Sequence, residues 1–174
     1  LLKLEQFAAE RDGRPGYFID IELNRFKQLN EAMGFKTGDK LIHDCVERIK
    51  SLLPPDTLIG RLGACEFGIA IPDECAEPTL EIQLDQLVAE VCKPYLIDER
   101  RVVVTVSAGA VEFGTTHMEQ VDMLKRANLA LHRSRSMGRK QWAMFEPELG
   151  RVADHRRWIE AEMQVAIDRQ DFEL

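Results

Sequence analysis

The stretch RLGACEFGIAI (residues 61–71) contains the second half of a β-hairpin. The two runs that meet in it, TLIGRL and EFGIAI, are rich in the branched and aromatic residues that favour β-strands. Between these runs, Gly63-Ala64-Cys65 forms a short turn with a glycine at its first position. The pattern therefore predicts an antiparallel hairpin over residues 57–71. A carboxylate, Glu66, directly follows the turn, so these residues also have the composition of a functional site.

Strand and helix patterns alternate on both sides of this hairpin. Apolar runs predict strands at residues 17–23, 93–98, 101–113 and 141–145. Apolar residues at helical spacing predict helices at residues 1–11, 24–34, 39–53, 78–92 and 118–136. The run 101–113 is apolar enough to be central in its sheet, and we expect it to pair with 93–98. This order predicts an α/β sandwich, with a central mixed sheet flanked by helices, in a domain of residues 1–146.

The last segment, residues 147–174, is predicted to be a protruding helix. Pro147 suits a first helical position, and apolar residues then recur at helical spacing among charges of both signs. Helices of this kind connect domains and dock their apolar stripe on a neighbour. We interpret the segment as a linker helix, and we expect the chain to be part of a longer protein.

Composition and charge argue against several classes of protein. The chain has 174 residues, 45% hydrophobic and 30% charged, which is ordinary for one globular domain. A formal net charge of -7 argues against a general nucleic-acid binder. The four cysteines form no C-x-x-C pair, which argues against a structural zinc site and favours a reducing compartment. Neither a membrane-spanning apolar run nor a signal-peptide pattern is present, so we expect a cytoplasmic segment without membrane contact.

Polar residues end the first predicted strand. Alternation places Asp20, Glu22 and Asn24 on one side of it, and sites in α/β folds form beyond strand ends. A structural alternative is that Asn24 only caps the following helix and that Glu22 is a solvated strand end. For the turn that precedes Glu66, the alternative is a tight hairpin without chemistry.

Two further groups suit a nucleotide. Asn30 and Asp39 lie on successive predicted helices, and an amide together with a carboxylate can read the edge of a base. Alternatively, Asp39 is a first-turn acid favoured by the helix dipole. The basic run RSRSMGRK (residues 133–140) ends a helix, and arginine forks suit phosphate oxygens. Cations also favour helix C-termini in general, which leaves a structural reading of this run open.

Four segments, in this order, resemble the GGDEF domain of diguanylate cyclases: ELNRFKQLNEAMGFKTGD, RLGACEF, VTVSAGAVEF and RANLALHRSRSMGRK. The resemblance covers about residues 16–146 and implies a cyclase-like palm fold. Active members of the family condense two GTP molecules into cyclic di-GMP, each of two domains contributing one substrate and its magnesium ions. The resemblance therefore implies GTP as ligand, magnesium as cofactor if nucleotide binds, and a possible homodimer.

The nucleotide-binding positions of the family are largely retained. Phe26-Lys27 match the phosphate-binding F-K, and Asn30 and Asp39 fall on the guanine-reading positions. Arg135 takes the place of a phosphate-contacting lysine, and Arg139 matches an arginine of the pattern. The resemblance thus implies that a guanine nucleotide can bind.

The catalytic positions depart from the family pattern. Glu22 replaces the first, metal-binding aspartate, and Asn24 replaces the second. Ala64 and Cys65 replace the second and third letters of the five-letter signature, and Cys65 thereby removes the other metal ligand. Glu66 survives as a catalytic residue that has become vestigial.

These departures predict a loss of catalysis. Mg²⁺ prefers hard oxygen ligands, whereas a thiol is soft and has a reference pKa of about 8.5. Loss of one well-placed group that stabilises a transferring phosphoryl group costs roughly 3–4 kcal/mol. The inhibitory R-x-x-D of the family is also absent, because Pro54 and Thr57 occupy its two defining positions.

We therefore interpret the chain as a catalytically silent GGDEF domain that binds GTP or relays signals to a C-terminal phosphodiesterase. Residues 147–174 resemble the helix that joins a GGDEF domain to an EAL phosphodiesterase domain, which is the expected partner. A second hypothesis is a weakly active cyclase in which Glu22 and Glu66 hold enough magnesium. A third is a structural or dimerisation module that binds no nucleotide.

Overall fold

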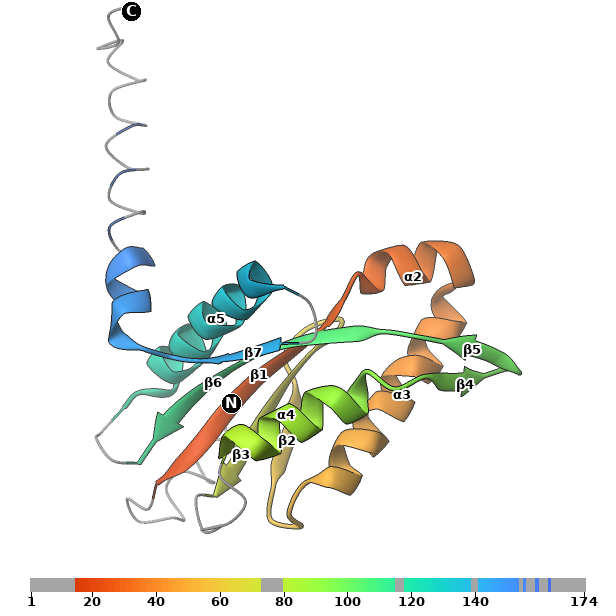
Figure 1. Cartoon of the computed structure of the whole chain (residues 1–174), viewed down its shortest axis with the longest axis horizontal. Coiled ribbons are helices and arrows are strands. Elements are labelled where there is room, and N and C mark those ends of the chain that lie inside the picture. Colours follow the sequence, from red (N-terminus) through yellow and green to blue (C-terminus); the bar gives the residue numbers. More distant parts are fainter. Residues whose placement is uncertain are drawn as a thin grey trace, which may run out of the picture.

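The computed structural model describes residues 15–72, 80–114, 118–138 and 141–153, together with residues 155, 159 and 163. Its centre is a five-stranded sheet with the strand order β2-β3-β1-β6-β7 (Figure 1). The strands of this sheet are β1 (Gly16–Asn24), β2 (Leu58–Arg61), β3 (Glu66–Pro72), β6 (Thr105–Phe113) and β7 (Gln141–Met144). Neighbouring strands are antiparallel except β6 and β7, which are parallel. The predicted mixed sheet and the β2–β3 hairpin are confirmed.

Helices cover both faces of this sheet. They are α2 (Phe26–Met33), α3 (Phe35–Leu52), α4 (Leu80–Val91) and α5 (Gln120–Met137). Alternation along β1 divides the core, since Ile19 and Ile21 pack with α3 and α4, whereas Phe18 packs with α5. Figure 1 shows α2 continuing from the end of β1 toward α3. The predicted α/β sandwich is confirmed, because each face of the sheet is buried by helices.

The expected pairing of the run 101–113 is right only in part. Its first residues belong to β5 (Arg100–Val102), which pairs with β4 (Tyr95–Ile97) as a separate two-stranded sheet. The later residues form β6, which lies inside the central sheet as expected. Asp98 and Glu99 have φ values of 49° and 63°, the left-handed geometry of a two-residue hairpin turn. The small hairpin contains only three residue pairs, from Tyr95↔Val102 to Ile97↔Arg100. The later residues of the apolar run pair with β1 and β7 in the central sheet.

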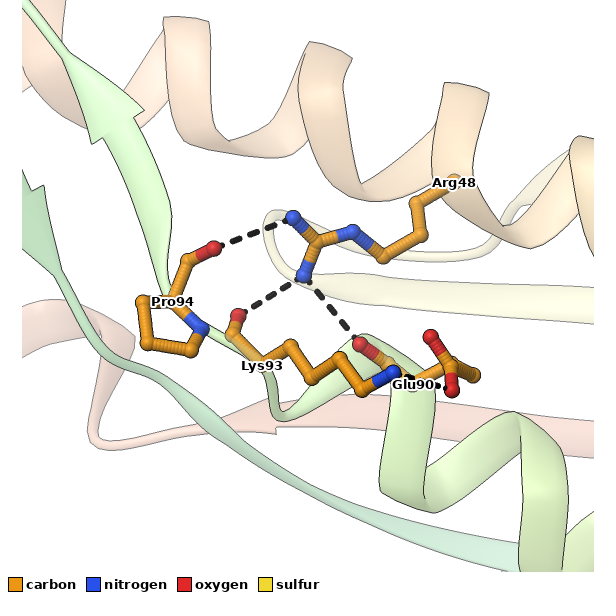
Figure 2. A network of polar contacts seen from close by, with 4 residues as sticks. All are labelled: Arg48, Glu90, Lys93 and Pro94. Carbon is orange, nitrogen blue, oxygen red and sulfur yellow. Dashed lines mark hydrogen bonds and ion pairs between the residues drawn. The ribbon is translucent and has the colours of Figure 1, made fainter.

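Arg48 of α3 holds the region that follows α4 (Figure 2). Its Nη1 donates to the carbonyl oxygens of Glu90 and Lys93, at 3.1 and 2.7 Å, and its Nη2 donates to that of Pro94 at 3.2 Å. The guanidinium also lies 3.6 Å from the ring centroid of Tyr95. Carbonyls at and beyond a helix C-terminus lack partners within the helix, and Arg48 bonds to three of them here. The Glu90 carbonyl also accepts from the backbone N–H of Lys93 at 3.0 Å.

We expect Arg48→Ala to lower the free energy of unfolding by about 2–3 kcal/mol, because it removes three charge-assisted hydrogen bonds and a cation–π contact. Arg48→Lys should recover only a minor part of this loss, since a single ammonium cannot reproduce the guanidinium fork. Urea denaturation of both variants measures the two effects. A loss below about 0.5 kcal/mol for Arg48→Ala would contradict the assigned role.

The C-terminal segment begins with the predicted helix. Residues 147–153 are helical, and so are the described positions farther along. Val152, Ile159 and Met163 are exposed apolar side chains at helical spacing. The linker role of this helix stays a prediction. The remaining C-terminal residues, and the helix expected at residues 1–11, lie outside the described part of the chain.

Candidate functional site

The site predicted at the end of β1 lies on the sheet face that α5 covers. Asp20 and Glu22 point to this face, as alternation along β1 requires, and Glu66 of β3 stands opposite Glu22. Asp20 is only 2% exposed and lies between Gly68 of β3 and Gly109 of β6. The structure thus places three acids of two neighbouring strands on one face of the sheet.

Asp20 is a buried acid with a perturbed protonation equilibrium. The pKa of Asp20 is raised to about 7, first by burial and then by the charge of the Glu66 carboxyl and a hydrogen bond with it. A hydrogen bond with Asn128 and the charge of Arg135, both on α5, act in the opposite direction. Asp20, Glu66 and Asn128 line a cavity of about 720 Å³ between α5 and the β2–β3 hairpin. The sequence placed Asp20 on the correct side of β1 but assigned it no role. The available signal was a carboxyl inside an otherwise apolar strand.

Glu22 of β1 and Arg135 of α5 form an ion pair through Oε2 and Nη2. Their side chains are 26% and 35% exposed, respectively, so the pair is partly shielded from water. The sequence predicted a metal-binding role for Glu22 and a phosphate-binding role for Arg135, and in the structure the two charges engage each other. Arg139, predicted beside Arg135, lies outside the described residues.

The turn between β2 and β3 is held by the Arg61 side chain and by the backbone. Arg61 donates from Nε to the carbonyl oxygen of Gly63 and from Nη2 to that of Ala64, at 2.9 and 2.7 Å. The backbone N–H of Leu23 donates to the carbonyl oxygen of Cys65 at 2.9 Å, which ties the turn to β1. Burial, followed by the charge of the next residue, raises the pKa of the Cys65 thiol. This thiol is therefore neutral near pH 7.

The residues at the metal positions of the family pattern do not form a magnesium site. Arg135 engages the Glu22 carboxylate, and Cys65 offers a neutral, soft thiol where Mg²⁺ prefers oxygen. Within the described ranges, no three His, Cys, Asp or Glu side chains are grouped so that they could hold a metal ion. The geometry around Glu22 thus does not support the predicted metal-binding role.

Asn24 does not cap α2, so that alternative interpretation is wrong. Its Nδ2 donates to Oγ1 of Thr105, and its Oδ1 accepts from Oγ of Ser107, both at 3.2 Å. Arg25, with a left-handed φ of 59°, takes the N-cap position instead. The reason is that β1 extends through Asn24, which pairs with Thr105, so the Asn24 side chain bonds to β6.

The N-terminus of α2 carries the residues predicted to bind phosphate. Phe26 is buried and anchors the first turn, whereas the side chain of Lys27 is 91% exposed and lies 3.9 Å from Glu31. Among the described residues, no side chain caps this helix N-terminus. Free backbone N–H groups at a helix N-terminus can bind an anion, and phosphate binding at this one stays a prediction.

The two guanine-reading positions lie on either side of the bend between α2 and α3. Gly38 lets the helices approach closely, since a Cβ at this position would lie 1.9 Å from Oδ1 of Asn30. Asp39 is exposed and lines a groove of about 600 Å³ between α3 and β2, whose described lining does not include Asn30. Because α3 begins at Phe35, Asp39 falls in its second turn, and the alternative reading as a first-turn acid is wrong.

Comparison with known proteins identifies the family. Residues 2–141 match the family model described as "Diguanylate cyclase, GGDEF domain". The chain belongs to the GGDEF family. It is 29% identical over 154 residues to the cyclic di-GMP phosphodiesterase NbdA of Pseudomonas aeruginosa, covering 88% of this chain and 20% of NbdA. It is 27% identical over 175 residues to the bifunctional diguanylate cyclase/cyclic di-GMP phosphodiesterase MucR of the same organism, covering 99% of this chain and 25% of MucR.

Solved structures agree with this assignment. An EAL/GGDEF domain protein from M. capsulatus has a TM-score of 0.73 to this GGDEF domain at 25% identity, covering 83% of this chain and 94% of that one. The predicted family and fold are therefore confirmed, and the chain is a GGDEF domain. It spans only about a fifth to a quarter of the length of the two curated relatives. No helix of the described residues is long and apolar enough to cross a membrane.

Proposed function

We propose that this GGDEF domain is catalytically silent, binds a guanine nucleotide and relays the bound state to a C-terminal phosphodiesterase domain. The observation that carries the proposal is the Glu22–Arg135 ion pair, which engages the carboxylate of the metal position within the protein. The groups predicted to read guanine, Asn30 and Asp39, are retained on adjoining helices.

Loss of cyclase activity follows from the charges at the site. Phosphoryl transfer depends on cations that stabilise charge on the transferring group. At the two metal positions of the family pattern, the Glu22 carboxylate is paired with Arg135, and Cys65 is a neutral thiol. Glu66 remains close by, but it shares a hydrogen bond with the buried Asp20. We therefore assign Glu66 a structural role rather than a catalytic one.

Relay to a phosphodiesterase rests on the relatives and on the C-terminal helix. NbdA is named as a cyclic di-GMP phosphodiesterase, and MucR as a bifunctional cyclase and phosphodiesterase. In this chain, residues 147–153 start a helix after β7 with apolar side chains exposed along it. We propose that residues 147–174 join the GGDEF domain of residues 1–146 to an EAL domain, onto which this apolar stripe docks.

Titration calorimetry of GTP into the domain with Mg²⁺, followed by analysis of the recovered nucleotide, tests the proposal. We expect a micromolar Kd and recovery of intact GTP. Asn30→Ala should abolish binding, whereas Gln28→Ala, an exposed polar position of the same helix, should leave it unchanged. Formation of cyclic di-GMP that is lost in Glu66→Ala would instead establish the weakly active cyclase. Absence of heat with wild-type protein would favour the structural module.

Gly38→Ala should weaken GTP binding by about tenfold while changing the free energy of unfolding by less than about 1 kcal/mol. The added methyl would overlap the Asn30 amide, the movable end of a side chain, and the Phe26 ring lies 3.0 Å away. The amide would therefore be displaced from its guanine-reading position. Calorimetry and urea denaturation measure the two quantities. Gly150→Ala, a helical glycine outside this groove whose Cβ would meet only the Phe145 ring at an ordinary 3.8 Å, is the matched control. An unchanged Kd for Gly38→Ala would show that the Asn30 position does not matter for binding.

A further inference from the structure

The Glu22–Arg135 ion pair places a cation where the family pattern has a metal. Glu22 lies opposite Glu66 of β3 and Ser107 of β6, and its carboxylate reaches Arg135 in the last turn of α5. Glutamate is one methylene longer than the aspartate of the family pattern, which extends the carboxylate from the strand toward the helix. Because both side chains are partly shielded from water, this ion pair is stronger than one on an open surface.

A divalent cation at Glu22 would have to displace the arginine. It would then stand beside an unpaired guanidinium, and like charges a few ångströms apart repel each other. The second metal position offers little in return, because Cys65 presents a thiol there instead of a carboxylate. Arginine thus excludes the metal on electrostatic grounds.

Arginine also supplies chemistry that a phosphate group can use. A guanidinium binds two phosphate oxygens at once with its planar fork of donors. Arg135 stands at the position predicted for phosphate contact, and Glu22 fixes its location at the end of β1. A nucleotide phosphate that reaches Arg135 therefore competes with the Glu22 carboxylate for the same donors.

We propose that Arg135 replaces the metal in this site, so that the domain binds nucleotide phosphates without a protein-bound divalent cation, while Glu22 positions Arg135 and competes with phosphate for it. This inference rests on the proposed nucleotide binding and adds how the phosphates are held. It also reverses the change in nucleotide affinity that is expected when the Glu22 carboxylate is removed. In a metal site, loss of this carboxylate weakens nucleotide binding, whereas here the loss strengthens it.

The experiment is a titration of GTP into the domain in Mg²⁺ and in EDTA, with three variants. Wild-type affinities in the two buffers should agree within about threefold. Glu22→Gln should raise the affinity in EDTA by about threefold to tenfold, because it removes a competing anion beside the phosphates. Arg135→Ala should lower it by about tenfold or more. Glu112→Gln, an exposed site near the other end of β6, removes the same charge and should change nothing.

A direct metal readout separates this inference from the proposed function. Mn²⁺ added without nucleotide should remain unbound by electron paramagnetic resonance, because Arg135 already occupies the position. Binding of Mn²⁺ that Glu22→Gln abolishes would overturn the inference even if GTP also binds. GTP binding that requires Mg²⁺ would overturn it as well, while leaving the proposed function intact. Absence of GTP binding in both buffers would overturn the proposed function and this mode with it.

Discussion

Gly109→Ala should lower the free energy of unfolding by about 3 kcal/mol or more, the upper end of the range for an overpacked core. A Cβ at Gly109 would lie 2.1 Å from the backbone nitrogen of Leu131 and 2.2 Å from the carbonyl oxygen of Ala127. These are backbone atoms of α5, so relief of the overlap requires the whole helix to move away from β6. Urea denaturation followed by circular dichroism measures the loss.

The control for Gly109→Ala is Gly60→Ala. Gly60 lies on the edge strand β2, and a Cβ there would meet nothing within 4 Å. Both substitutions add one methyl group to a strand glycine, so their difference reports the contact between β6 and α5. A Gly109→Ala protein within about 1 kcal/mol of wild type would contradict the close approach of helix and sheet.

Asp20→Asn should stabilise the domain above neutral pH and should remove a pH dependence from its stability. Asp20 is buried, and burial together with Glu66 raises its pKa to about 7 from the ordinary value of 3.8. Between these two values the folded state binds more protons than the unfolded state, so stability falls as pH rises. The linkage relation sets an upper limit of about 4 kcal/mol on this loss. Asparagine resembles the protonated acid and avoids the loss.

Urea denaturation between about pH 4 and pH 8 measures this effect as the difference between wild type and Asp20→Asn. We expect the variant to match wild type near the acid end and to exceed it by about 2–4 kcal/mol at the basic end. Asp56→Asn, an exposed acid in the loop before β2, provides the control and should leave the slope unchanged. A difference between Asp20→Asn and wild type that stays constant with pH would contradict the raised pKa.

Local patterns were sufficient to predict most of the fold. The hairpin over residues 57–71 and the central position of β6 follow from runs of strand-forming residues and from one turn, all within a few positions of each other. The division of the run 101–113 between β5 and β6 was not predictable in this way. It depends on left-handed backbone angles at Asp98 and Glu99, and glutamate in particular adopts these angles infrequently.

The composition of the site was predictable, but its contacts were not. Alternation along β1 predicted that Asp20, Glu22 and Asn24 lie on one side of the strand. In the structure, Asp20 and Glu22 both face α5. The role of Asn24 as a helix cap was a sound local interpretation that a distant partner overrides. Its amide instead bonds to Thr105, which is 81 residues away in the sequence. A helix cap joins residues that are close in the sequence, whereas the pairing of β1 with β6 joins residues that are far apart in it.

The sequence by itself determined the family, the order of the strands and helices other than β5, and the loss of the acid that Cys65 replaces. Each of these depends only on residue identity or on short-range periodicity. Only the tertiary structure decided how the remaining charges are used. The pairing of Glu22 with Arg135 and the burial of Asp20 beneath α5 require that the helix pack on Gly109. Electrostatic interactions act over ångströms in space and not over positions in sequence, so they exist only after the sheet and α5 have come together.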